Sequence, residues 1–289
     1  MGFQIIHGVP QTAWYPVINT DTLYVGQLVI CKNEGVEPLR QAFGVADSTH
    51  RTRANGILAE GNSSASNNTI FGLVIGTNAR TPSFSATYNA EQIVYASPNA
   101  STVNTDTYFG TGGGPWAMGD MLAMVKVAIL DPCITLRAPL YQSSSVVNTA
   151  PTVGTVTAST SGLTATTGTV SVVGVASQST VYFRTGSAAG VYRVTDDTSA
   201  TVHAWDVPLS STAASAQVGD TLVKVNLRPV GKCRAQISNE ALWINSGASV
   251  TTNYFSIDVT RLDLSVAGKE YVDFRFDPVH FSIGVQATS

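Results

Sequence analysis

Apolar and polar residues alternate with a period of two along much of this chain, which is typical of β-strands that bury one face. In 272–276 two Phe residues and one Val alternate with Asp and Arg, and a similar alternation runs through 279–286. Pro278 separates the two runs, so the pattern predicts two strands or one bent edge strand there. Apolar residues at helical spacing are hard to find anywhere, which favours an all-β fold.

Two segments predict β-structure in more detail. A change of apolar phase within 255–264 predicts a β-bulge near Thr260-Arg261. Strand-like runs at 181–184, 191–194 and 201–205 are separated by short, turn-rich segments. Connections this short make neighbouring strands antiparallel, so these runs predict a meander.

A recurring turn opens three of the predicted strands. Gly followed by a small polar residue and then an apolar run occurs at 26–29, 119–123 and 219–223. The last two copies extend further, because Cys133 and Cys233 lie the same distance after their glycines. The recurrence indicates either an internal duplication or a short sequence motif that is common in β-proteins. In both cases the three segments are predicted to be strands.

These patterns predict an all-β protein of antiparallel sandwich or barrel-like domains with long loops. Residues 1–142 are predicted to form an N-terminal β domain with an extended N-terminal arm, and residues 170–289 a C-terminal β domain. Between them, 143–169 is rich in Ser and Thr and is predicted to be a linker or edge region with one strand. The polar stretch 61–69 is predicted to be an exposed loop.

The composition of the chain argues against several classes of function. Charged residues make up 12% of the chain, about half of the roughly 25% usual in soluble domains. The net charge is -3 and the 16 Lys and Arg residues are scattered, so direct nucleic-acid binding is not expected. Neither a Sec-type leader nor a membrane helix is predicted. The cysteines, Cys31, Cys133 and Cys233, are odd in number and lack a C-x-x-C pair, which predicts reduced, buried thiols.

Signatures of catalysis and of cofactor binding are missing from the sequence. The four histidines are far apart and show no metal-ligand spacing, and no Gly-x-Ser-x-Gly motif is present. The glycine-rich run 110–115 lacks the Gly-Lys-Ser/Thr of a phosphate-binding loop. Carboxylates such as Asp258, Asp263 and Asp273 are read as turn or solvated-face residues rather than as a glycosidase pair. The sequence therefore predicts no enzyme, no cofactor and no metal site.

Two groups of aromatic residues are candidate partner contacts. Trp14 and Tyr15 lie between two prolines, which keep the chain extended, while the aromatic rings favour burial. Such an arm docks on a neighbouring subunit or packs on its own domain. Tyr108, Phe109 and Trp116 flank the glycine-rich run, where they either insert into a partner or cap the core.

Part of the chain resembles a known family. The motifs Asp-Thr-Leu-Tyr-Val-Gly-Gln-Leu-Val at 21–29, Phe-Gly-Val-Ala-Asp at 43–47, Asn-Gly-Ile at 55–57 and Phe-Gly-Leu-Val at 71–74 resemble the decoration and cement proteins of tailed-phage heads. The resemblance covers about the first 80 residues, and the chain departs from simple decoration proteins in its length and its additional C-terminal β region.

The resemblance implies a capsid decoration protein that binds the major capsid protein and copies of itself, as a dimer or trimer. It implies a protein made in the host cytoplasm and located on the virion surface. A low charge fraction suits a protein that buries much of its surface against neighbours. The alternatives are a receptor-binding or adhesin-like β protein and a carbohydrate-active enzyme. A major shell subunit is a variant of the decoration-protein hypothesis.

Overall fold

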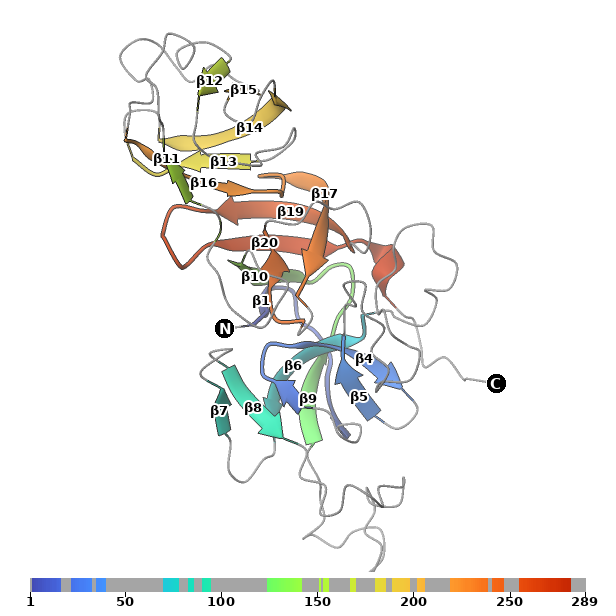
Figure 1. The fold of residues 1–289 in the computed structure, drawn as a ribbon. Helices are drawn as coiled ribbons and strands as arrows, with labels where there is room; N and C mark the ends of the chain where they lie inside the picture. The colour runs from blue at the N-terminus through green and yellow to red at the C-terminus, as the bar shows by residue number, and fades with distance from the viewer. Residues whose placement is uncertain are drawn as a thin grey trace, which may run out of the picture.

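In a computed structural model the chain folds into antiparallel β-sheets, which confirms the predicted all-β class (Figure 1). Within the part that the structure describes there is no α-helix, and a short 3₁₀ helix occupies Pro278–His280. The described residues are 2–16, 22–32, 35–39, 70–77, 83–85, 90–94, 124–141, 151, 153–155, 167–169, 180–185, 189–197, 202–205, 219–238, 241–246 and 255–281.

The centre of the molecule is a ring of strands. It consists of β10 (Thr135–Tyr141), β20 (Tyr271–Phe276), β19 (Phe255–Asp263), β17 (Gly231–Ile237) and β18 (Ile244–Asn245). Successive members pair antiparallel, and β18 returns to pair with β10 in parallel, so the ring closes into a small barrel. Strand β1 (Gln4–His7) pairs with β10 beside β18. Closure leaves the barrel strands few free edges.

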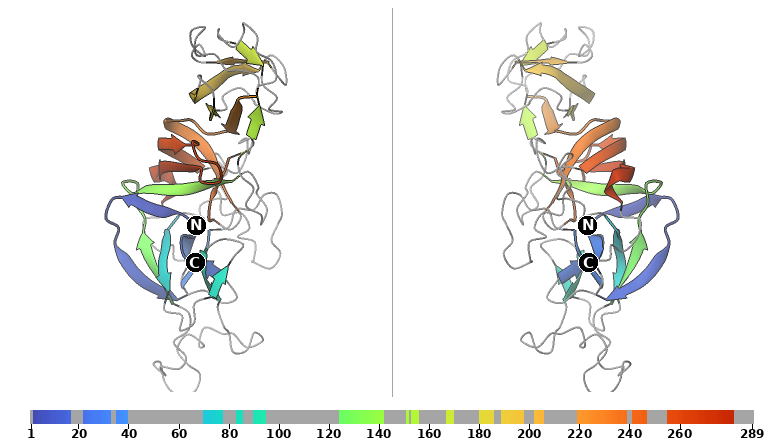
Figure 2. Two further views of the ribbon diagram at one scale, coloured as in Figure 1. Left: turned by 90° about the vertical axis from the view of Figure 1, so that its left-hand side faces the viewer. Right: turned by 90° about the vertical axis from the view of Figure 1, so that its right-hand side faces the viewer.

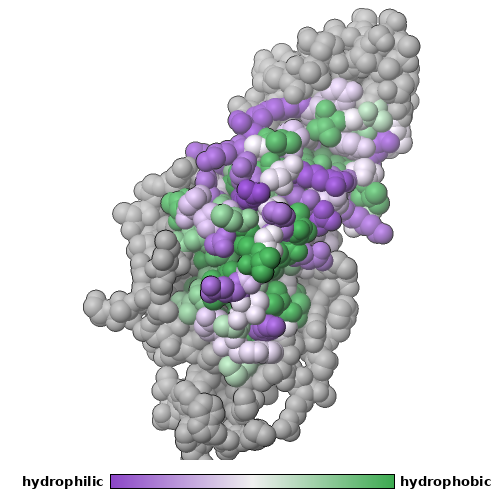
Figure 3. Space-filling model, turned by 180° about the vertical axis from the view of Figure 1, so that it is seen from behind, coloured by the Kyte–Doolittle hydropathy of each residue, from purple (hydrophilic) through white to green (hydrophobic). Residues whose placement is uncertain are grey.

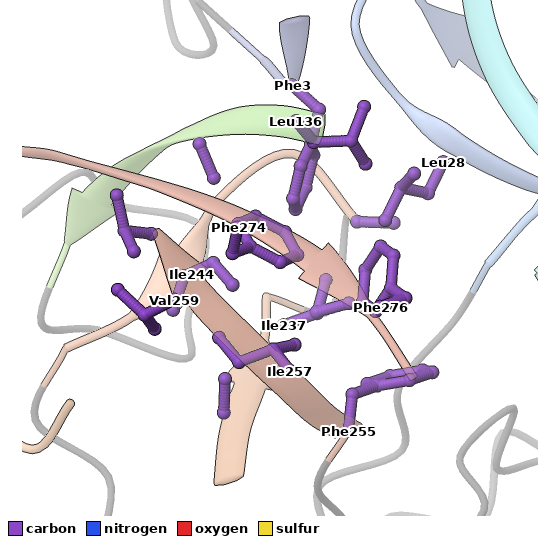
Figure 4. Packing of buried hydrophobic residues seen from close by; sticks show 14 of the residues in the cluster. Phe3, Leu28, Leu136, Ile237, Ile244, Phe255, Ile257, Val259, Phe274 and Phe276 are labelled. Carbon is purple, nitrogen blue, oxygen red and sulfur yellow. The ribbon is translucent and has the colours of Figure 1, made fainter. Parts of the chain in front are cut away.

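Alternate residues of the barrel strands point inward and form a hydrophobic cluster together with residues of the two neighbouring sheets (Figure 4). Phe274 lies at its centre, with ring centroids 4.9 Å from Phe276 and 6.1 Å from Phe3, both in edge-to-face arrangements. Such aromatic pairs add to the stabilisation that comes from burial alone. The apolar residues of the period-two pattern in 272–276 are therefore the residues that fill the barrel interior.

A second set of strands lies below the barrel in Figure 1. Its main sheet, here called the lower sheet, has the order β2 (Thr12–Pro16), β9 (Met124–Ile129), β6 (Gly72–Thr77), β4 (Leu28–Lys32) and β5 (Gly35–Pro38). Its two end strands approach each other, so the sheet curls into a half-barrel. A smaller sheet beside it contains β3 (Thr22–Tyr24), β8 (Ala90–Val94) and β7 (Ser83–Ser85).

A third sheet, the upper sheet, lies on the opposite side of the barrel, and both side views show the same order of the three parts (Figure 2). It has the order β11 (Val153–Thr155), β16 (Thr221–Val225), β13 (Thr180–Phe183), β14 (Gly190–Asp197), β15 (Val202–Trp205) and β12 (Thr167–Thr169). Strands β13, β14 and β15 are consecutive and antiparallel, which confirms the predicted meander.

The chain leaves the barrel twice and returns to it twice. After β1 it builds the lower sheet and comes back through β9 into β10, and after β10 it builds the upper sheet and comes back through β16 into β17. In the sequence both returns follow a copy of the recurring turn. The copies at 26–29 and 219–223 lead into β4 and β16, as predicted, whereas the copy at 119–123 lies outside the described residues and β9 begins directly after it.

The predicted division of the chain into 1–142 and 170–289 stays a prediction, although the barrel takes strands from both ranges. The segment 143–169, predicted to hold one strand, contains the two short strands β11 and β12.

Other local predictions have mixed outcomes. The pairing of β19 with β20 shifts between Val259 and Arg261, which confirms the predicted bulge. The predicted strand at 279–286 is wrong at its start, because Pro278–His280 is a 3₁₀ helix and Val279 is exposed. The rest of that run, 282–286, lies outside the described residues. None of the three cysteines, all of which lie in the described ranges, forms a disulfide. The prediction that they are buried is wrong: Cys31 and Cys233 are half-buried, and Cys133 is exposed because it lies in the turn between β9 and β10.

Candidate interaction surfaces

The N-terminal segment is part of the fold. Phe3 is buried in the barrel core, and its N–H donates to the carbonyl oxygen of Gly26 at 2.7 Å. Gly26 has a φ of 88° in the turn before β4, and a Cβ on Gly2 would come within 2.3 Å of the Gly26 oxygen. Two glycines are thus needed for this close backbone approach. Of the two alternatives for the predicted arm, the structure has the segment packed on its own chain.

Trp14 and Tyr15 are neighbours on β2 and therefore point to opposite faces of the lower sheet. The Tyr15 ring packs edge-on against Phe71 at 5.1 Å and joins the valine core of the lower sheet. Burial raises the pKa of the Tyr15 hydroxyl, and the nearby Cys31 adds to the shift. The Trp14 side chain is 48% exposed. Of this predicted pair, Trp14 is the residue that is accessible to a partner.

Exposed apolar side chains gather in the stretch that joins the barrel to the lower sheet. Ile6, Val9 and Trp14 are 41%, 96% and 48% exposed. Residues 4–16 contain no Asp, Glu, Lys or Arg. The stretch is fixed at both ends, because β1 pairs with β10 and β2 pairs with β9. It is therefore an ordered, uncharged and apolar surface segment, here called the 6–14 segment.

One face of the lower sheet carries a row of residues that includes Trp14. Trp14 pairs with Lys126 on β9, and Lys126 pairs with Gly76 on β6. The register of β6 shifts between Val74 and Gly76, so Ile75 is a bulge residue, and its side chain is 38% exposed. The lone Lys of the strand was visible in the sequence. No sequence signal marked Ile75 or Gly76, because their position depends on the pairing of β6 with β9.

The outer wall of the barrel is polar. Arg137 on β10 pairs with Asp273 on β20, which in turn pairs with Arg261 on β19. Arg137 donates from Nε and an Nη to both carboxylate oxygens of Asp273, at 2.7 and 2.9 Å. Both arginines lie over the Tyr271 ring, with the guanidinium carbons of Arg137 and Arg261 at 3.9 and 5.6 Å from its centroid. Cation–π contacts and a bidentate ion pair thus order this wall.

Asp263 completes the polar wall. Its carboxylate accepts from the Ser265 hydroxyl at 2.6 Å, from the Arg261 guanidinium at 3.0 Å and from the Tyr271 hydroxyl at 3.1 Å. Hydrogen bonding from Ser265 is the main reason that the pKa of Asp263 is lowered. Asp263 and Asp273 are both engaged in ion pairs and hydrogen bonds, so these carboxylates serve to order the barrel wall. Figure 3 shows polar and apolar groups side by side on the described surface of this part of the molecule.

A buried ion pair joins the upper sheet to the barrel. Arg184, which follows β13, pairs with Glu270, which precedes β20, and both side chains are almost inaccessible. The Nε of Arg184 also donates to the carbonyl oxygen of Leu264 at 2.9 Å. A buried charge needs such partners, because desolvation without them is costly.

The remaining predicted contact residues, Tyr108, Phe109 and Trp116, lie outside the described residues. In the described ranges no group of three or more His, Cys, Asp or Glu side chains is placed to hold a metal ion. His280 is buried, with its Nε2 accepting from the Ser256 N–H at 2.8 Å. None of the described residues forms a helix with the length and apolarity that a membrane-spanning segment needs.

Comparisons of the chain with protein families, with curated proteins and with solved structures find no match.

Proposed function

We propose that this chain is a virion structural protein, a decoration or cement protein that binds the head shell of a tailed phage. Its partners in this proposal are the major capsid protein and further copies of itself, and its location is the outer surface of the capsid after synthesis in the host cytoplasm. The family resemblance of residues 21–29 and 71–74 supplies the viral context. The exposed apolar 6–14 segment supports assembly with a partner.

The observation that carries the proposal is the exposure of the 6–14 segment. An exposed apolar side chain is common on any protein, but three lie within the one uncharged stretch 6–14, and exposed apolar side chains so close in sequence favour contact with a partner. Strand pairing at both ends has already ordered the stretch, so docking costs little further conformational entropy. Many copies on a symmetric shell multiply a modest contact into stable attachment.

The polar wall of the barrel supports the same assignment. Asp263 and Asp273 are held by arginine, serine and tyrosine donors. A glycosidase would need two carboxylates facing a substrate across a cleft. This arrangement favours a structural role over the carbohydrate-active alternative.

A shell-binding assay tests the proposal. Purified chain is mixed with head shells that lack it, and bound protein is measured after sedimentation at increasing concentrations. Saturable binding at a fixed ratio to the shell subunit is the expected result. Binding to host-cell glycans with no affinity for shells would contradict it and favour the receptor-binding alternative.

A further inference from the structure

Trp14, Lys126 and Gly76 form a row across three neighbouring strands of the lower sheet. Directly paired residues of antiparallel strands present their side chains on the same face, about 4.5–5.5 Å apart. Gly76 has no side chain, and a Cβ built there would meet only the Cβ of Lys126, at 3.7 Å, among the atoms that the structure describes. The Gly76 side of the row is therefore a shallow notch, with the stem of Lys126 as one wall.

Ile75 lies beside the notch. As the extra residue of a bulge it is displaced from the regular pairing of β6 with β9, and its side chain is partly open to solvent. Together Trp14, Ile75, Gly76 and Lys126 are called the Trp14 surface here. It offers two large apolar groups, a notch and one cation.

The Trp14 surface continues an apolar face that the molecule itself covers. Two residues further along the strands, Thr12 pairs with Ala128 and Ala128 pairs with Leu73. Ala128 and Leu73 are buried, and Leu73 belongs to the core cluster that the lower sheet shares with the barrel. The same face is thus covered by the barrel at one end and open at the end that carries Trp14. A partner that docks there would extend the existing burial.

Docking through side chains suits this edge of the sheet better than addition of a strand. Strand β2 is the end strand of the lower sheet, and its last residue is Pro16, which has no N–H to donate. Proline on an edge strand is a common protection against pairing with another chain. The partner is therefore expected to approach the face rather than the edge.

Charge identifies the chemistry of the partner. Lys126 is the only Lys, Arg, Asp or Glu in β2, β6 and β9. A cation on an otherwise uncharged apolar face is best matched by a carboxylate surrounded by apolar groups. We propose that the Trp14 surface receives an apolar side chain in the notch at Gly76 and a carboxylate beside Lys126, both from a subunit of the head shell. This inference rests on the proposed shell-binding function.

The test compares full-length variants in the shell-sedimentation titration. Gly76→Leu fills the notch; the backbone of Gly76 is outside the left-handed region and its Cβ position is open, so the variant is expected to fold. Trp14→Ala removes the main apolar group, and Lys126→Glu reverses the charge. Each is expected to weaken binding about 10- to 100-fold, which is the lower end of the effects of interface hot spots.

Matched controls change exposed residues elsewhere. Lys269→Glu reverses an exposed lysine on the β19–β20 hairpin, and Val279→Ala trims an exposed valine on the 3₁₀ helix. Both are expected to bind as the wild type does. The denaturation midpoint of every variant shows whether a loss of binding reflects a loss of folding.

The outcomes separate the inference from the function on which it rests. If the wild type binds shells and the folded Gly76→Leu and Lys126→Glu variants bind equally well, the docking site is wrong and the proposed function stands. If the wild type does not bind shells, the proposed function fails and the inference falls with it. If Gly76→Leu leaves shell binding intact but abolishes self-association in light scattering, the occupant is a second copy and the inference is overturned.

Discussion

Replacement of Arg184 by Met is expected to destabilise the contact between the upper sheet and the barrel. The Arg184 and Glu270 side chains are 11% and 2% exposed, so this ion pair is almost fully removed from water. Without Arg184, the Glu270 carboxylate stays buried with its cation gone, and the Leu264 carbonyl loses its donor. Removing one partner of a buried pair costs about 3–5 kcal/mol, whereas an exposed pair contributes about 0–1 kcal/mol.

The double variant Arg184→Met with Glu270→Leu distinguishes the cost of a stranded charge from the loss of a favourable contact. Apolar residues of similar volume often replace a buried ion pair without loss of stability. The double variant is therefore expected to be more stable than the Arg184→Met single variant, although it carries one more substitution.

The assay is urea denaturation followed by circular dichroism, with hydrogen exchange of the β13 amides as a local readout. The single variant is expected to lower the free energy of unfolding and to speed exchange in β13 before exchange in the barrel core. A loss below about 1 kcal/mol in the free energy of unfolding of the single variant would contradict the burial of this ion pair, because a hydrated surface pair contributes that much.

Three further predictions concern the barrel and its turns. Phe274→Ala is expected to cost about 3–5 kcal/mol in the free energy of unfolding because it empties the centre of the core, while Val266→Ala on the exposed hairpin is expected to stay within about 0.5 kcal/mol of the wild type. Cys133 is expected to be the fast-reacting thiol in a native-state titration with a thiol reagent, because burial raises the pKa of each of the other two, and Cys133→Ser should remove the fast phase. The pKa of Asp263 is lowered by folding, so its stabilisation is present above the unfolded pKa of about 3.9 and is lost as pH falls through the lower folded value. The measurement is NMR titration of Asp263, and a midpoint at or above that unfolded value would contradict the assignment.

The sequence predicted those parts of the fold that depend on local alternation. The phase change in 255–264 located the bulge, and the short connections around 185–190 and 196–199 predicted the meander, because both are set by neighbouring residues. The same reasoning was wrong for Val279, where the alternating pattern continued through a segment that Pro278 starts as a 3₁₀ helix. Proline fixes the backbone there whatever the phase of the side chains.

The barrel itself could not be predicted in this way. Its closure depends on β10 pairing with β20 and β18, contacts between segments more than 100 residues apart. The pattern also placed Asp273 on a solvated face, whereas the structure buries it because Arg137, 136 residues away in sequence, supplies both hydrogen bonds. Of the candidate contacts, Trp14 was available from the sequence, but its neighbours in the row follow from the register of three strands.

Quantification of this chain among the proteins of purified virions is the most direct test of the proposed decoration function. The chain is expected to be abundant, in a fixed ratio to the major capsid protein, and to remain with intact heads through purification. Its absence from virions, or its presence in a few copies confined to the tail, would contradict a role as a decoration protein of the shell.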